Sequence, residues 1–176
     1  RAFLVADRIS LAGWSLHRRF MSKTAPLALL DFPRVARHEF GFDAIELNNV
    51  FFAETSPRYL DELRSRAAGE GVEMLNIAVD RCGDMASPEG WRLAVENHLP
   101  WLDVAAPLGC SAIRANIGGE GATSPEAALE TAKESFARLA IEGGKRGVTL
   151  LIENHWGLST DPAAIVAVVS SRPLRE

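Results

Sequence analysis

Short apolar runs recur along the chain, each opened by a glycine and closed by a polar side chain. Four segments share this pattern: Gly41–Glu46, Gly71–Asn76, Gly109–Arg114 and Gly147–Asn154. Glycine is favoured at the left-handed position that ends a helix, and the apolar residue after it packs back on the last turn. The apolar run that follows is typical of a buried strand. The pattern therefore predicts the end of a helix and the start of a strand at each of these places.

A second pattern lies between these segments, where Ser or Asp directly precedes proline. It occurs at Ser56-Pro57, Ser87-Pro88, Ser124-Pro125 and Asp161-Pro162. Such a side chain accepts free N–H groups of a first helical turn, and proline fits the first helical position because it has no N–H to lose. Each pair therefore predicts a helix start.

Apolar residues at helical spacing support three of these predicted helices. The clearest helix runs from Pro125 to Arg146. Its buried face is expected to contain Ala128, Ala132, Phe136, Leu139 and Ala140. The buried face of the helix that follows Pro57 is expected to contain Tyr59, Leu60, Leu63 and Ala67. That of the helix that follows Pro88 is expected to contain Trp91, Val95, Leu99, Leu102 and Ala106.

A less regular first unit consists of a strand at Ile9–Ala12 and a helix at Pro33–Phe40. Strands then begin near positions 9, 44, 73, 112 and 149, which gives five βα units. Their spacing of about 35 residues favours parallel strands joined by right-handed crossovers.

Two folds accept this order: an open doubly wound sheet and a (β/α)8 barrel. The doubly wound sheet usually carries a phosphate-binding loop after its first strand, and Gly13–His17 has no GxGxxG pattern. The glycine-rich loop Gly118–Gly121 is either an anion site at a helix start or a plain loop. Eight units would need about 280 residues. The chain of 176 residues is therefore expected to be one α/β domain, 1–176, with five of the eight units of a TIM-barrel-like fold.

The barrel is favoured by the polar residues at the predicted strand ends, because barrel enzymes build their sites there. Glu46, Asn76, Arg114 and Glu153 occupy these ends, and Asn48, Asn116 and His155 follow two residues later.

Composition narrows the function classes. The chain has 47% hydrophobic residues, a net charge of −4 and a pI near 5.6, so it lacks the basic footprint of a nucleic-acid-binding protein. No apolar run approaches the length of a membrane span. Cys82 and Cys110 form no CxxC pair, which fits a reducing, cytoplasmic setting. We therefore expect neither nucleic acid nor a membrane as partner.

Glu153 is the sharpest candidate for chemistry, because a carboxylate at the end of an apolar strand is costly unless it is paired or bound to a metal. The alternative is an ion pair with Arg114 on the neighbouring strand. Arg114 itself either holds a substrate anion or neutralises a carboxylate, Glu153 or Glu46. We expect Glu46, Arg114, Asn116, His155 and His17 to contact a ligand, although a rim position or a surface loop would also explain the two histidines.

Three segments resemble strands of the xylose isomerase-like TIM barrels. Gly147–His155 resembles the fifth strand of that superfamily, Gly41–Leu47 the second and Ser111–Gly119 the fourth. The superfamily covers sugar-phosphate isomerases and epimerases, inosose dehydratases and family 2 apurinic endonucleases. The resemblance covers nearly the whole chain, but only as the first five of eight units.

The resemblance implies that Glu153 is a ligand of a divalent metal and acts as the catalytic base. Mn²⁺, Mg²⁺ or Co²⁺ suits such oxygen-rich sites, and Zn²⁺ is compatible. The other ligands of the family, an Asp, a His and a second Glu, come from later strands. The implied reaction is proton abstraction beside the carbonyl of a sugar or polyol, through an enediolate.

Departures from the family limit the choice of reaction. Ketose 3-epimerases carry a further carboxylate where Trp156–Ser159 stands here, and the nucleases need histidines where Glu46, Asn76 and Arg114 stand. An isomerase, epimerase or dehydratase is therefore preferred over a nuclease. A non-catalytic or anion-binding α/β module is the alternative. Because the end strands of a partial barrel are open edges, we also expect self-association into a homo-oligomer or poor solubility.

Overall fold

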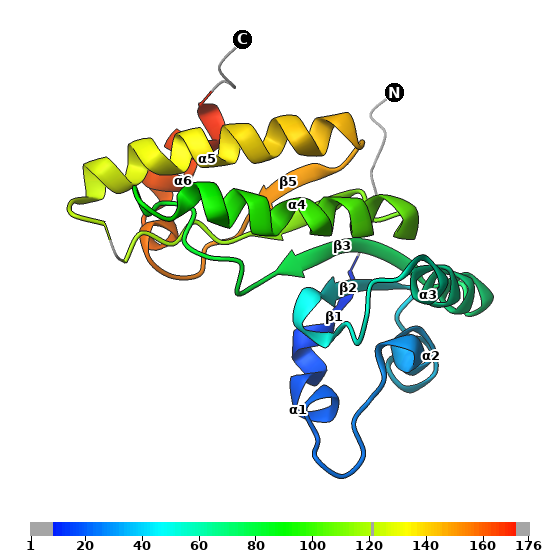
Figure 1. Cartoon of the computed structure of the whole chain (residues 1–176). Coiled ribbons are helices and arrows are strands. Elements are labelled where there is room, and N and C mark those ends of the chain that lie inside the picture. Colours follow the sequence, from blue (N-terminus) through cyan, green and yellow to red (C-terminus); the bar gives the residue numbers. More distant parts are fainter. Residues whose placement is uncertain (1–8, 121, 172–176) are drawn as a thin grey trace, which may run out of the picture.

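One parallel sheet organises the computed structural model, which describes residues 9–120 and 122–171 (Figure 1). Its strands are β1 (Leu11–Ala12), β2 (Ala44–Asn48), β3 (Glu73–Val79), β4 (Ala112–Ala115) and β5 (Thr149–Ile152). They pair in parallel in the order β1-β2-β3-β4-β5. A doubly wound sheet would reverse its order at a switch point. The unbroken order therefore confirms the prediction of a TIM-barrel-like α/β fold.

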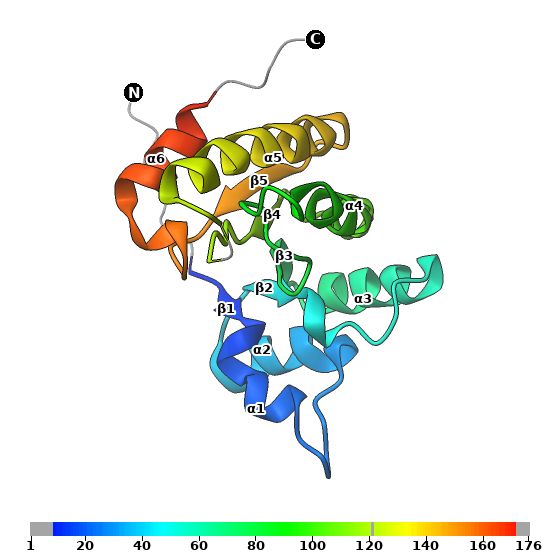
Figure 2. The same ribbon diagram turned by 60° about the vertical axis from the view of Figure 1, so that its left-hand side comes forward.

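The connections between strands carry the helices. These are α1 (His17–Phe20), α2 (Phe32–Phe40), α3 (Pro57–Gly69), α4 (Trp91–Leu108), α5 (Pro125–Lys145) and α6 (Pro162–Ser170). Figure 2 shows α2 to α5 along one side of the strands, as in the outer layer of a barrel. Within the described part of the chain, none of these helices is long and apolar enough to cross a membrane.

The core lies between the sheet and this outer layer of helices. The strand residues that face the helices are almost fully buried: Ile45, Leu47, Ile77, Val79, Ile113 and Ala115. Helix α5 packs on them through the predicted residues Ala128, Ala132, Phe136 and Leu139, which are buried. Ala140, which was also predicted on this face, is exposed. Ala106 of α4 is exposed as well. Both alanines lie past the edge of the buried stripe, because each helix contacts the sheet on one side only.

Three of the four predicted caps are confirmed. The side chains of Ser56, Ser124 and Asp161 accept N–H groups from the first turns of α3, α5 and α6. The prediction for Ser87 is wrong in detail, because its hydroxyl accepts the N–H of Gly90 in a separate turn before α4.

The two end strands differ from the prediction. Strand β1 is only two residues long, and Ile9 lies outside it with 72% of its surface exposed. Strand β5 is not buried, since its residues alternate between exposed and partly buried. It pairs only with β4 among the described strands, and the helices cover only its Leu150 and Ile152 side. Leu151 on the other side is 41% exposed.

Candidate functional site at the carboxyl ends of the strands

Polar side chains gather on the face of the sheet that points away from the helices. The strand register places Glu46 opposite Asn76, and Ala78 opposite Arg114. Because alternate residues share a face, this face carries the following polar residues: Glu46, Asn48, Asn76, Asp80, Arg114, Asn116 and Glu153. The sheet thus brings together side chains from four strands, at the edge where barrel enzymes build their sites.

Arg114 is the centre of this polar face, and only 8% of it is exposed. Its Nη1 donates to Asp80 Oδ1 at 2.7 Å, and its Nε lies 3.2 Å from Glu153 Oε2. The ion pair with Glu153 is the alternative that the sequence left open. Glu46 is not its partner, because that carboxylate accepts a hydrogen bond from Asn76 Nδ2 at 2.9 Å.

Asp80 belongs to the site, although sequence reasoning missed it. The predicted strand ended at Asn76, whereas β3 continues to Val79. Counting by twos from Asn76 would have reached Asp80, on the same face as Arg114. Asn49 fixes its backbone through two hydrogen bonds: its Nδ2 donates to the Asp80 carbonyl at 2.9 Å, and the Asp80 N–H donates to its Oδ1 at 2.8 Å.

Buried polar atoms without a hydrogen bond also mark this face. In the described part of the chain they are Asn48 Oδ1, Arg114 Nε and Asn116 Oδ1. Arg114 Nε retains its ion pair with Glu153, and Asn116 donates through Nδ2 to Asp80 at 2.9 Å. An unmade bond of this kind costs about 1–3 kcal/mol. Their concentration in one place marks this face as the candidate functional site.

A cavity of about 350 Å³ opens over these residues, within the size range of small-molecule sites. It brings together four of the predicted site residues: Glu46, Arg114, Glu153 and His155. It is lined as well by Asn48, Asp80, Arg81 and the half-exposed ring of Trp14. The arrangement offers carboxylates and an arginine to a hydroxyl-rich molecule.

The other two predicted residues lie outside this lining. Asn116 holds Asp80 and lines a neighbouring cavity. His17 stacks on Trp14, with 5.2 Å between ring centroids, and its Nδ1 bonds the Trp14 carbonyl oxygen at 2.8 Å. His17 thus contacts Trp14, which lines the cavity, and does not line the cavity itself.

The donors for a metal are incomplete. Glu153 offers a carboxylate that is 52% exposed in its side chain, but the described residues contain no group of three His, Cys, Asp or Glu donors that could hold an ion. The guanidinium of Arg114, 3.2 Å away, also opposes a cation at this carboxylate. The described residues therefore fit one ligand of a metal site and not the whole site.

The glycine-rich loop is occupied by the protein's own groups. The Gly119 N–H donates to Asp84 Oδ1 at 2.9 Å, and the Gly118 carbonyl accepts the N–H of Leu158 at 2.9 Å. Gly121 lies outside the described residues. An anion at this loop would have to displace the Asp84 carboxylate.

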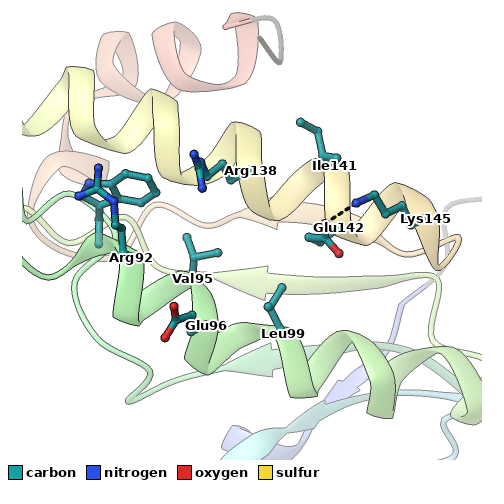
Figure 3. A pocket seen from close by; sticks show the side chains of 9 residues that line it. Arg92, Val95, Glu96, Leu99, Arg138, Ile141, Glu142 and Lys145 are labelled. Atoms are coloured by element: carbon teal, nitrogen blue, oxygen red, sulfur yellow. Dashed lines mark hydrogen bonds and ion pairs between the residues drawn. The ribbon is translucent and has the colours of Figure 1, made fainter. Parts of the chain in front are cut away.

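A separate groove of about 500 Å³ lies between α4 and α5 (Figure 3). The guanidinium carbons of Arg92 and Arg138 lie 4.5 and 5.4 Å from the centroid of the Trp91 ring, and Lys145 pairs with Glu142 at 2.6 Å. Residues from the strand ends do not line this groove. It is thus distinct from the inner-face site.

The chain belongs to the xylose isomerase-like TIM barrel family, whose sequence profile matches residues 35–171. This match covers most of the described strands and confirms the resemblance that the strand motifs suggested. A search of curated proteins found no match.

Solved structures of this fold are similar to the chain. A xylose isomerase-like TIM barrel protein from Mycobacterium smegmatis, in complex with magnesium, has a TM-score of 0.69 and 18% identity, over 92% of this chain and 60% of that one. For 3-keto-D-glucoside 4-epimerase from E. coli the TM-score is 0.72 and the identity 14%, over 93% and 64%. For a family 2 AP endonuclease from Brucella melitensis they are 0.65 and 20%, over 94% and 65%. The chain thus spans about three fifths of the length of these proteins, and the shared fold does not select one reaction.

Proposed function

We propose that the chain supplies the first five βα units of a sugar isomerase or epimerase that moves a proton beside a carbonyl. The observation that carries this proposal is the row Asp80–Arg114–Glu153 at the strand ends, with Glu46 and His155 beside it over one cavity. Carboxylates that line a cavity of sugar size are suited to general acid–base work. The epimerase of similar fold supports the same reaction class.

Glu153 is proposed as the base. Its carboxylate takes a proton from the carbon next to the substrate carbonyl, and the two carbons with their oxygens become an enediolate. A proton delivered to the other face of the same carbon gives the epimer. Return of the proton to the former carbonyl carbon, with transfer of the hydroxyl proton from one oxygen to the other, gives the isomer. Arg114 holds Glu153 in place from one side, and Asp80 in turn holds Arg114. Glu46, oriented by Asn76, is placed to bind substrate hydroxyls.

We extend the proposal to a divalent ion, Mn²⁺, Mg²⁺ or Co²⁺, with Zn²⁺ compatible. Glu153 would be the one ligand that the described residues supply, and the remaining ligands would lie outside them. When bound, such an ion stabilises negative charge on substrate oxygens. The magnesium complex of a similar barrel supports this extension.

A nuclease shares the fold, but the residues at the strand ends favour a sugar. Glu46, Asn76 and Arg114 occupy positions where the related nucleases need histidines, and the net charge of −4 opposes a DNA backbone. We also propose a cytoplasmic location, supported by two free and buried cysteines, Cys82 and Cys110. A small sugar or polyol is the proposed partner.

The first experiment follows product formation from a panel of ketoses and keto-glycosides, with Mn²⁺ or Mg²⁺ added, by NMR. It uses the protein isolated from its source beside the 176-residue chain, and the intact mass of the former is measured. We expect about 30 kDa and turnover that Glu153→Gln reduces by at least about a hundredfold, in line with the loss of a general base. The control Glu89→Gln changes an exposed carboxylate outside the cavity. Unchanged turnover in Glu153→Gln would remove Glu153 from the mechanism. A source protein of 19.1 kDa without turnover would favour a non-catalytic module.

A further inference from the structure

A second cavity, of about 370 Å³, adjoins the site on the far side of Asp80. Asp80 and Arg81 line both cavities. The second cavity is also lined by His98, Asn116 and Trp156. The shared lining makes the two cavities neighbours along one edge of the sheet, so one elongated molecule can reach both.

His98 is a buried acceptor on the wall of this second cavity. It is 2% exposed, and its Nδ1 lies 2.7 Å from the Ala94 carbonyl oxygen. A carbonyl only accepts, so Nδ1 carries the hydrogen. Burial lowers the pKa of the ring and outweighs the hydrogen bond to Ala94, which raises it, so the fold favours the neutral ring. Nε2 therefore keeps its lone pair, and within the described residues it has no hydrogen-bond donor.

Arg81 is an uncommitted cation at the junction of the two cavities. It is exposed, and it forms no ion pair or hydrogen bond with another described residue. Asp80, its neighbour in sequence, is already engaged by Arg114 and Asn116 on the same oxygen. The charge of Arg81 is therefore available to a ligand.

We propose that the second cavity binds the hydroxylated, anionic end of the substrate, with a hydroxyl donating to Nε2 of His98 and a phosphate or carboxylate paired with Arg81. The inference rests on the proposed function and narrows its substrate class to anionic sugars. Arginine suits either anion because its planar fork donates two parallel hydrogen bonds. Trp156 supplies the apolar wall against which a sugar ring packs.

The test uses the 176-residue chain labelled with ¹⁵N in its histidines. The probes are D-glucose 6-phosphate, D-gluconate and D-glucose, and inorganic phosphate is titrated alone. We expect the Nε2 resonance of His98 to move with one or both of the anionic sugars, which also tells which anion the site takes. Affinity for that sugar should exceed the affinity for glucose by at least about tenfold. Arg81→Asn should remove the advantage, since asparagine tolerates a positive φ of 61° and carries no charge.

The matched control is Arg58→Asn, which removes another exposed arginine, from α3, and should leave the affinities unchanged. Equal binding of glucose, an unmoved Nε2 resonance, or an advantage that survives Arg81→Asn would each overturn the proposal. So would inorganic phosphate that binds as tightly as the sugar phosphate. The shift of the His98 Nε2 resonance is read in the wild-type chain, so this part of the test does not depend on whether Arg81→Asn folds. Binding at this site, if the protein isolated from its source shows no turnover, would support this site and overturn the proposed reaction. Turnover by the source protein with an unmoved His98 resonance would overturn this site and support the proposed reaction.

Discussion

Removal of the Arg114 guanidinium is expected to destabilise the fold, because it leaves Asp80 with one hydrogen bond to its carboxylate instead of two. Arg114→Met keeps the apolar stem and much of the volume. The lost bond to Asp80 is 2.7 Å long and links an 8% exposed residue to a carboxylate that is 23% exposed in its side chain. Bonds to charged groups contribute about 1.5–3 kcal/mol. The pair with the half-exposed Glu153 adds less than about 1 kcal/mol. A loss of about 2–3 kcal/mol in the free energy of unfolding is therefore expected.

Equilibrium urea unfolding followed by circular dichroism measures this loss, and a double-mutant cycle with Asp80→Asn isolates the pair. We expect a coupling energy of about 1.5–2 kcal/mol. The control is Arg64→Met, which breaks a 2.8 Å ion pair with Asp61 on the surface of α3 and should cost less than about 0.5 kcal/mol. A coupling between Arg114 and Asp80 as small as that of the surface pair would refute the reasoning, because it would show that burial gives the pair no extra strength.

Three further predictions rest on other parts of the fold. Gly157→Ala should destabilise the chain by more than about 1 kcal/mol in the same urea assay, because φ is +63° and the added Cβ would meet the Gly118 carbonyl. The control Gly144→Ala, with open space around it inside α5, should be neutral or stabilising. Equal effects of the two substitutions would count against this loop geometry. Burial lowers the pKa of His98 from its ordinary 6.5, so below that pH the unfolded state binds a proton more readily than the folded state. The free energy of unfolding should therefore fall between pH 7 and about pH 5 more steeply in the wild type than in His98→Gln. Parallel pH profiles would contradict the burial of a neutral ring. Val166 and Val169 of α6 are 63% and 68% exposed, so the 176-residue chain should self-associate in light scattering, and their replacement by lysine should reduce the association. A wild-type monomer would contradict the prediction that this exposed apolar face of α6 drives association.

Local rules predicted the βα order because each of them acts within a few residues. Glycine after a helix and Ser or Asp before proline work through backbone N–H groups nearby, and Ser124 and Asp161 cap their helices as expected. Ser87 shows the limit of such a rule, since the same dipeptide built a turn in front of α4.

The contents of the site depended on facts that a single strand does not contain. Asp80 was missed because the end of β3 is set by its pairing with β4, and this pairing continues as far as Val79 of β3. The predicted burial of β5 was wrong because burial depends on neighbours on both sides, and the described sheet supplies only β4. The choice between a paired and a free Glu153 required the register that sets Arg114 beside it.

The proton transfer itself is tested most directly by deuterium exchange. The protein isolated from its source is incubated in D₂O with a ketose or keto-glycoside that it converts, and solvent deuterium at the carbon beside the carbonyl is followed by NMR. We predict that wild-type protein incorporates deuterium at that carbon, and that Glu153→Gln incorporates it at least about a hundredfold more slowly. Incorporation at the wild-type rate in Glu153→Gln would contradict the assignment of Glu153 as the base.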